Sequence, residues 1–279
     1  MDYKTILVTL DESKACAPRL DVAVRLAQGF KAHLVGLFVM PLPFVPTFVA
    51  AEIPVEVIEA QSKAIRAAAD RVEARFKDAA SKAGVAAEWR RIEDEFVDPG
   101  SVAALHARYA DLAIVGQSDP ERAGEGPTLA EDVLFDSGCP VLVVPYAGRF
   151  PTVGERPVVA WNASREAARA VHDAMPILAK AKTVTILAAN PKKGRGGHGD
   201  MPGADIALSL SRHGVKAEAE SIYGSDIEVG DMILSRLADK GADMLVMGAY
   251  GHSRLRESIF GGVTLKLFRE MTVPVLMSH

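Results

Sequence analysis

The sequence predicts an α/β protein built from two tandem, Rossmann-like doubly wound domains, each with a five-stranded parallel sheet flanked by helices. Three observations support this fold. Short apolar segments alternate with segments of helical periodicity, the same order of segments occurs twice, and a polar stretch containing Gly and Pro separates the two copies. Strands that alternate with helices indicate a parallel sheet covered on both faces. Because the repeat is unbroken, we expect one domain at 1–147 and a second at 156–279.

The first half contains five segments with the length and content of buried strands, separated by helical segments. The expected strands are 5–10, 33–40, 84–92, 111–115 and 139–145, and the expected helices are 15–30, a long one from 57 onward, 101–109 and 129–135. The long helix has one apolar stripe, at Ile58, Ile65, Val72 and Phe76, with charges elsewhere. The 84–92 segment alternates between apolar and polar residues, which indicates a strand near a sheet edge.

The second half repeats these segments one by one. The matched pairs are TILVTLDES (5–13) with PVVAWNAS (157–164), 33–41 with 183–191, GVAAE (84–88) with GVKAE (214–218), DLAIVG (111–116) with DMLVMG (243–248), and CPVLVVP (139–145) with VPVLMSH (273–279). The first half has about twenty extra residues between its second and third strands. This insertion, at 42–80, comprises an apolar loop at 42–53 and a longer helix.

Composition limits the classes of function. With 49% hydrophobic and 24% charged residues the chain can bury full cores, and a net charge of −4 without a dense Lys/Arg run argues against nucleic acid as a main partner. No apolar run approaches the ~20 residues that span a bilayer, and the N-terminus has no signal-peptide pattern. Cys16 and Cys139 offer neither a disulfide framework nor metal-ligand spacing. We therefore expect a cytoplasmic protein without a membrane partner.

A glycine-rich stretch in the second half has the arrangement of a phosphate-binding loop. Gly248 ends an apolar strand, Gly251 follows three residues later, and Gly261 and Gly262 precede an expected helix at 263–271. Glycine allows close approach of the backbone and positive φ, and the N-terminus of a helix attracts anions. The alternative is that these glycines only form turns in a long surface loop.

At these residues the chain resembles the universal stress protein family. Gly248-x-x-Gly251, nine residues and then Gly261 resembles the family's G-2x-G-9x-G(S/T) nucleotide-binding motif. The sequence departs from the motif at Gly262, where the family usually has Ser or Thr, whereas Thr264 matches a second hydroxyl position. Over nearly the whole chain the duplicated unit resembles tandem-type members of the family. The resemblance implies strand order 3-2-1-4-5, ligands at the carboxyl ends of strands one and four, and an intramolecular pseudo-dimer through the fifth strands at 141–144 and 275–277.

The resemblance also assigns roles to residues of the second half. Asn162 stands where the family has a carboxylate after strand one, a position that Asp11 occupies in the first half, and the adenine-contacting backbone maps to Ala189. The implied nucleotide-binding residues are Ala160, Asn162, Ala189, Gly248, Gly251, His252, Arg254, Gly261, Gly262, Val263 and Thr264. Asn162 can bond a ribose, cap the following helix, or do both. His252, Arg254 and Arg256 either neutralise phosphate or are solvated loop residues.

The first half lacks this loop. Asp119 stands at the second motif glycine and Leu129 at the third, and Asp119, Glu121 and Glu125 would repel phosphate. We therefore expect one nucleotide per chain, bound in the second half.

The expected function is that of a stress-response protein that binds ATP, or ADP or AMP, with or without Mg²⁺, and acts as a nucleotide-dependent regulatory or interaction module. No P-loop, nucleophile elbow or His/Cys metal cluster is present, so no catalytic residue is nominated and slow ATP hydrolysis is the most that we expect. The alternatives are an enzyme of the wider adenine-nucleotide α-hydrolase-like class, and a scaffold or hydrophobic-ligand binder that uses the apolar loop at 42–53. The sequence leaves open the protein partner and whether a further homodimer forms.

Overall fold

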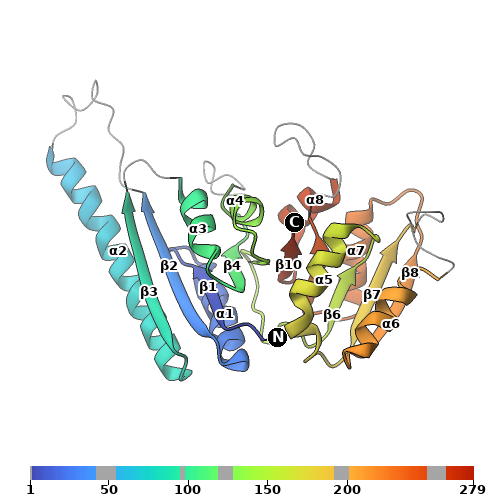
Figure 1. Cartoon of the computed structure of the whole chain (residues 1–279). Coiled ribbons are helices and arrows are strands. Elements are labelled where there is room, and N and C mark those ends of the chain that lie inside the picture. Colours follow the sequence, from blue (N-terminus) through green and yellow to red (C-terminus); the bar gives the residue numbers. More distant parts are fainter. Residues whose placement is uncertain (1, 42–54, 95–97, 119–127, 192–200, 250–261) are drawn as a thin grey trace. The chain divides into compact units, whose positions relative to one another are not determined.

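The computed structural model describes residues 2–41, 55–94, 98–118, 128–191, 201–249 and 262–279 (Figure 1). Its contacts divide the chain into two compact units. The first, here called the N-terminal unit, comprises residues 3–116 and 127–139, and the second, the C-terminal unit, comprises residues 1–2, 117–126 and 140–279. The apolar loop at 42–53 lies outside the described residues.

The N-terminal unit is a parallel sheet with strand order β3-β2-β1-β4. Its strands are β1 (Thr5–Thr9), β2 (His33–Pro41), β3 (Ala87–Asp94) and β4 (Leu112–Gly116), and its helices are α1 (Cys16–Phe30), α2 (Val55–Lys82), α3 (Pro99–Ala107) and α4 (Thr128–Asp136). Side chains such as Ile6, Leu112 and Ile114 are fully buried. Continuous burial explains why these strands are apolar throughout, since helices cover both faces of a parallel sheet.

The C-terminal unit has the strand order β5-β10-β9-β6-β7-β8. Its strands are β5 (Val141–Val144), β6 (Pro157–Ala160), β7 (Val184–Ala189), β8 (Ala217–Ile222), β9 (Met244–Gly248) and β10 (Val275–Ser278), and its helices are α5 (Arg165–Leu178), α6 (Ala204–Arg212), α7 (Val229–Asp239) and α8 (Gly262–Glu270). The five strands of the second repeat, β6 to β10, are parallel to one another and follow the predicted order 3-2-1-4-5. The predicted fold class is confirmed.

The fifth strand of the first repeat lies in the C-terminal unit. β5 pairs antiparallel with β10, with Val143 opposite Val275 and Leu142 opposite Leu276. Gln117, which directly follows β4 in sequence, is buried in the same unit. Its side-chain nitrogen donates to the carbonyls of Phe268 (2.7 Å) and Arg269 (3.1 Å), and thereby satisfies two groups at the C-terminal end of α8. The compact units therefore do not follow the boundary between the sequence repeats.

Two element ends differ from the expectation because of local backbone chemistry. β3 begins at Ala87, not at residue 84, because Gly84 has φ of 65° and terminates α2, with Val85 N donating to Ala80 O at 3.0 Å. α3 begins at Pro99, two residues earlier than expected, because Asp98 caps it by accepting from Ser101 N at 2.8 Å.

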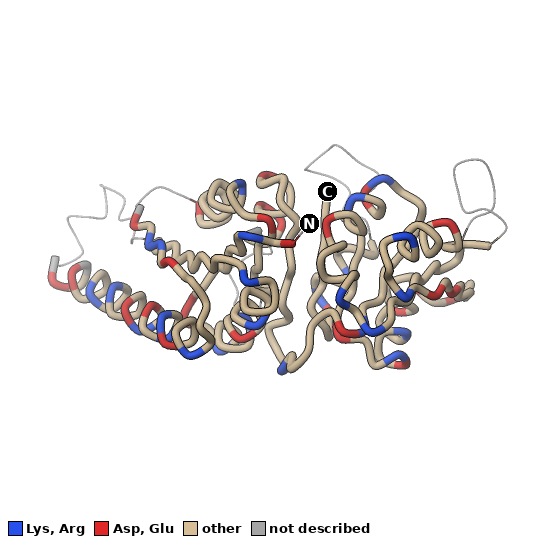
Figure 2. Tube along the Cα trace, turned by 60° about the horizontal axis from the view of Figure 1, so that its bottom comes forward, with Lys and Arg blue, Asp and Glu red and all other residues tan. Residues whose placement is uncertain are grey.

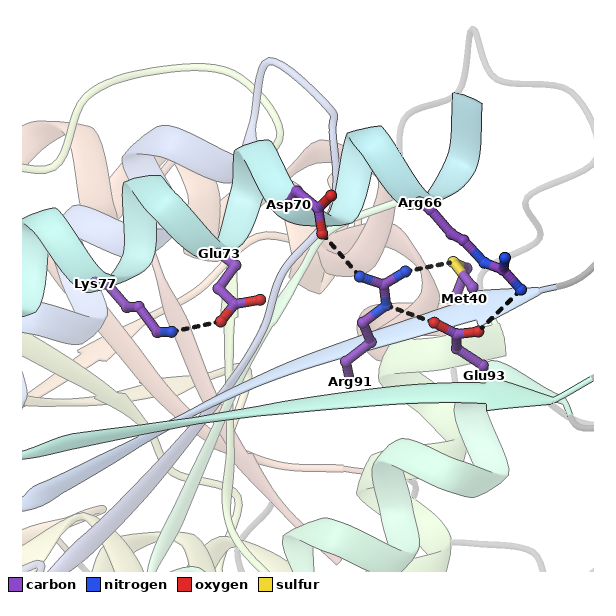
Figure 3. Close-up of polar contacts among 7 residues, drawn as sticks. All are labelled: Met40, Arg66, Asp70, Glu73, Lys77, Arg91 and Glu93. Atoms are coloured by element: carbon purple, nitrogen blue, oxygen red, sulfur yellow. Dashed lines mark hydrogen bonds and ion pairs between the residues drawn. The ribbon is translucent and has the colours of Figure 1, made fainter. Parts of the chain in front are cut away.

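Helix α2 packs on the sheet through its apolar stripe. Val72 and Phe76 are buried, as predicted, and the side chain of Ile58 lies outside the description. Figure 2 shows charges of both signs along this helix, and Figure 3 shows how some of them meet β3: Asp70 contacts Arg91 at 2.9 Å, and Arg66 contacts Glu93 at 3.6 Å. Because exposed ion pairs contribute little, the stripe supplies most of the stability of this packing.

None of the described helices is both long enough and apolar enough to cross a membrane.

Candidate functional site

The switch point of the second repeat lies at the carboxyl ends of β6 and β9. β6 lies between β7 and β9, and Ala160 stands in register with Leu187 of β7 and Met247 of β9. The chain leaves β6 toward β7 on one side, whereas β9 pairs on the other side. In open α/β sheets such a reversal of strand order leaves a crevice at the carboxyl ends, where ligands bind. The structure thus brings Ala160 and Gly248 to the same edge of the sheet.

The loop after β6 is held by a turn that Asn162 stabilises. The Asn162 side-chain oxygen accepts from Ser164 N at 3.1 Å, and Ala163 between them has φ of 60°. Ser164 is the cap of α5, because its hydroxyl accepts from Ala167 N at 3.1 Å. The suggestion that Asn162 caps this helix is therefore wrong. Asn162 itself is exposed, so its amide nitrogen can face a ligand.

The end of β7 is locked to the end of β8 by Asn190, a residue that the sequence reasoning missed. Asn190 has φ of 46°, and its side chain accepts from Gly224 N at 2.9 Å and donates to Gly224 O at 2.8 Å. This two-point contact fixes the backbone directly after Ala189, the position that the resemblance assigns to adenine. The signal in the sequence was the Asn190–Pro191 pair, which is typical of a turn.

Gly248, at the end of β9, is required by packing. A Cβ at this position would overlap the backbone nitrogen of Ala167 and lie 2.8 Å from the Glu166 Cβ. The first turn of α5 therefore packs directly on this glycine, and any side chain would push the helix away. This packing role alone accounts for the glycine and does not conflict with a nearby ligand.

Helix α8 begins at Gly262, the residue that departs from the family motif. Gly262 is exposed, its φ is outside the left-handed region, and among the described residues no atom beyond its own helix lies within 4 Å of a Cβ added there. A serine would therefore fit. Val263 is half-buried, and Thr264 is buried on the face of α8 that also carries Leu267 and Phe268, so packing explains its burial. Gly251, His252, Arg254, Arg256 and Gly261 lie outside the described residues.

The lysine of α8 is engaged in ion pairs. Lys266 Nζ lies 3.0 Å from Asp231, 3.4 Å from Glu270 and 3.6 Å from Glu228. The hydrogen bond to Asp231 and the surrounding negative charges raise the pKa of Lys266. This cation therefore serves the packing of α7 and α8, and we do not assign it to a ligand.

The corresponding position in the first repeat is already occupied by an ion pair. Asp11, after β1, accepts from Ser13 N at 2.6 Å and from Arg19 Nη2 at 2.5 Å. Burial by itself would raise the pKa of Asp11, but the charge of Arg19 and these hydrogen bonds outweigh it and hold the pKa below its usual value. The sequence reasoning missed Arg19, whose only signal was a charge among the apolar residues of an amphipathic helix.

The described residues contain no group of three or more His, Cys, Asp or Glu side chains placed to hold a metal ion. At the second switch point Asn162 replaces a carboxylate, so the described protein groups offer Mg²⁺ an amide and backbone oxygens rather than a charged ligand.

Two successive doubly wound repeats, each with a glycine at the end of its fourth strand, place the chain among tandem α/β proteins. The chain belongs to the universal stress protein family: the sequence profile of the universal stress protein family matches residues 2–145 and again residues 155–279. The tandem arrangement expected from the repeat agrees with this double match.

Individual relatives are more distant. "Universal stress protein Slr1230" of Synechocystis sp. is 37% identical over 67 residues, which are 24% of this chain and 22% of that protein. The chain thus matches less than a quarter of the length of this relative. The solved universal stress protein of Archaeoglobus fulgidus DSM 4304 has a TM-score of 0.76 at 18% identity, with 98% of this chain and 95% of that chain covered. A solved protein of Pseudomonas aeruginosa UCBPP-PA14 has a TM-score of 0.60 at 15% identity over 99% of this chain and 93% of that chain. At these identities the two structures show the fold alone.

Proposed function

We propose that the second repeat binds ATP or a related adenine nucleotide at the carboxyl ends of β6 and β9, and that the protein is a nucleotide-dependent regulatory or interaction module in a stress response. One observation carries the proposal: the spacing Gly248-x-x-Gly251-nine residues-Gly261 links the end of β9 directly to the start of α8, beside the switch point. Membership of the universal stress protein family supports the stress-response role.

In this proposal each part of the nucleotide has its own protein groups. The base lies against the backbone at Ala189, which Asn190 holds in place, and the ribose lies near Ala160 and the exposed amide of Asn162. The phosphates lie at the glycine loop and the first turn of α8, where backbone N–H groups lack partners within the helix. His252 and Arg254 then add positive charge. No residue is assigned to a chemical step, so the output of binding is a change of conformation or partner.

The β5–β10 pairing suggests how the two repeats are joined. We propose that this antiparallel contact replaces the dimer contact that single-domain members make, so that one chain is an internal pseudo-dimer with domains at 1–147 and 156–279. We also propose that the protein acts in the cytoplasm on an unidentified protein partner.

The test is calorimetric titration of the purified protein with ATP, ADP and AMP, with and without Mg²⁺. We expect one site per chain in the wild type and none in a Gly251→Asp, Gly261→Asp double variant, because two introduced carboxylates repel phosphate. A matched control, Gly29→Asp, places a carboxylate on an exposed glycine of α1, where no described atom crowds an added Cβ. No heat at millimolar ATP in the wild type would overturn the proposal.

A second experiment changes Gly262, the residue at which the sequence departs from the family motif. Gly262→Ser restores the family hydroxyl at a position where a side chain fits, and one additional hydrogen bond to a phosphate should tighten ATP binding about tenfold. Gly262→Ala is the control, because it adds a Cβ without a hydroxyl and should leave the affinity unchanged. If the serine variant binds ATP no better than the alanine variant, the phosphates do not lie at this end of α8.

A further inference from the structure

We propose that Arg19 acts as a built-in ligand of the first repeat: its guanidinium holds Asp11 at the switch point, so that this repeat carries an internal cation at the position where the second repeat has Ala170. The proposal concerns a binding position in the N-terminal unit and does not depend on nucleotide binding in the second repeat.

The guanidinium bridges the carboxyl ends of two neighbouring strands. Arg19 Nη2 donates to Asp11, which follows β1, and Arg19 Nη1 lies so close to Gly116, at the end of β4, that a Cβ there would overlap it. β1 and β4 are paired neighbours, and β2 lies on the other side of β1, which makes this edge the switch point of the first repeat. The guanidinium therefore lies in the position where open α/β sheets bind ligands.

The exposed fractions of the two side chains show that the arginine is buried at the switch point. The Arg19 side chain is 5% exposed, whereas the Asp11 side chain is 48% exposed. Both carboxylate oxygens of Asp11 are engaged, Oδ1 by Ser13 N and Oδ2 by Arg19. Asp11 is half-exposed to solvent, but a ligand that took the place of the guanidinium would leave a buried positive charge without its partner.

The second repeat lacks this device. Counting eight residues from Asp11 leads to Arg19, and counting eight residues from Asn162 leads to Ala170, a fully buried alanine on the inner face of α5. No cation extends from that position, and Asn162 carries no charge to hold one. The first turn of α5 instead packs directly on Gly248, as described above. The corresponding turn residues thus differ: Asp11 holds a buried arginine, whereas Asn162 presents an exposed amide.

The Arg19–Asp11 ion pair leaves part of the guanidinium without a hydrogen bond in the described part of the chain. Arg19 Nε is buried and has no hydrogen-bond partner among the described residues, although a guanidinium has five N–H groups to satisfy. A buried pair of this kind adds little net stability over an apolar pair of the same volume, yet loss of one member is costly. These properties fit a group that keeps a position occupied.

The experiment is chemical rescue with methylguanidinium chloride, and methylammonium chloride serves as the salt control. Arg19→Ala should open a cation position that methylguanidinium refills, so that the thermal midpoint rises in a saturable way, by roughly 3–5 °C at about ten times the dissociation constant. The wild type, in which Arg19 fills the position, and the double variant Arg19→Ala, Asp11→Asn, which lacks the anion, should show no such rise. A rise in Arg19→Ala no larger than in the double variant would overturn the proposal.

A second comparison decides the matter if Arg19→Ala fails to fold. Asp11→Asn leaves the guanidinium buried without its anion, whereas Arg19→Met fills the same space without charge and leaves Asp11 able to be hydrated. The proposal requires the thermal midpoint of Asp11→Asn to fall below that of Arg19→Met. The opposite order would show that Arg19 is only a spacer between α1 and β4.

Discussion

Gly248 and Gly262 are two motif glycines with different physical reasons for lacking a side chain. The first lies under the backbone of α5, whereas no described residue outside α8 crowds a Cβ added to the second, at the start of α8. Sequence spacing alone treats them as equivalent members of one motif. The structure separates a glycine that packing requires from one that tolerates substitution.

This difference predicts that the same substitution destabilises the protein at one glycine and has little effect at the other. Gly248→Ala should lower the free energy of unfolding by about 3 kcal/mol, because the new methyl group overlaps backbone atoms that cannot rotate away. Gly262→Ala, the matched control, should change it by less than about 0.5 kcal/mol. Urea denaturation measures both, and equal values would contradict the packing of α5 on Gly248.

The lowered pKa of Asp11 predicts how stability depends on pH. A carboxylate whose pKa is lower in the folded state stabilises the protein at pH values above its unfolded pKa, near 3.8, and loses that contribution as the pH falls through the folded value. The difference in unfolding free energy between wild type and Asp11→Asn should thus be complete at pH 5–7, at about 1–2 kcal/mol for a half-exposed carboxylate, and shrink below pH ~4.

Urea denaturation from pH 3 to pH 7 checks this dependence. Asn162→Asp places a carboxylate at the matching exposed turn, where the position that corresponds to Arg19 is Ala170, and should show little such dependence. A difference between wild type and Asp11→Asn that persists unchanged at pH 3 would mean that the Arg19–Asp11 pair does not stabilise the fold.

At the scale of elements, strands and helices could be predicted because their apolar patterns reflect burial on a doubly wound sheet. Their ends could not, since they depend on single backbone events such as the left-handed Gly84 and the Asp98 cap. The positions of the candidate site were predictable for the same reason: strand ends follow from strand order. Asn190 and Arg19 were not, because the partner of Asn190 is distant in sequence and Arg19 is hidden on a helix face.

The Asn190 clamp between the ends of β7 and β8 gives the element-scale prediction. Asn190→Ala should cost about 1–3 kcal/mol, because it removes both hydrogen bonds to Gly224 and leaves a residue with a Cβ at φ of 46°. Asn190→Gly removes the same bonds but relieves the backbone, so it should cost about 1 kcal/mol less.

Hydrogen exchange of the Gly224 amide locates the effect. Its protection should fall in both Asn190 variants, while amides in the middle of β7 keep theirs. Full protection of Gly224 in either variant would show that the side-chain contact does not hold this loop.

At the scale of the whole molecule, the sequence repeat and the compact units divide the chain differently, because β5 and Gln117 belong with the second repeat in space. A duplicated sequence therefore does not produce two self-sufficient halves. The repeat predicted the fold of each half, but not which unit its last strand would join.

Fragments 1–147 and 156–279, produced together, should consequently associate. The first fragment presents the edge of Val141–Val144, and the second presents Val275–Ser278, whose pairing buries both. Analytical ultracentrifugation measures the association, and Val143→Asp in the first fragment, which places a charge in the buried ladder, should abolish it. Two stable, separate monomers would contradict a dependence of β5 on β10.

The pairing of β5 with β10 also has a consequence for the newly made protein. A ribosome that has just completed Val141–Val144 must add about 130 further residues before the partner strand exists. At bacterial or eukaryotic rates of translation this takes on the order of ten seconds. Throughout that interval an apolar strand edge of the nascent chain has no native partner, which makes it a natural point of contact for a chaperone or for another unfinished chain.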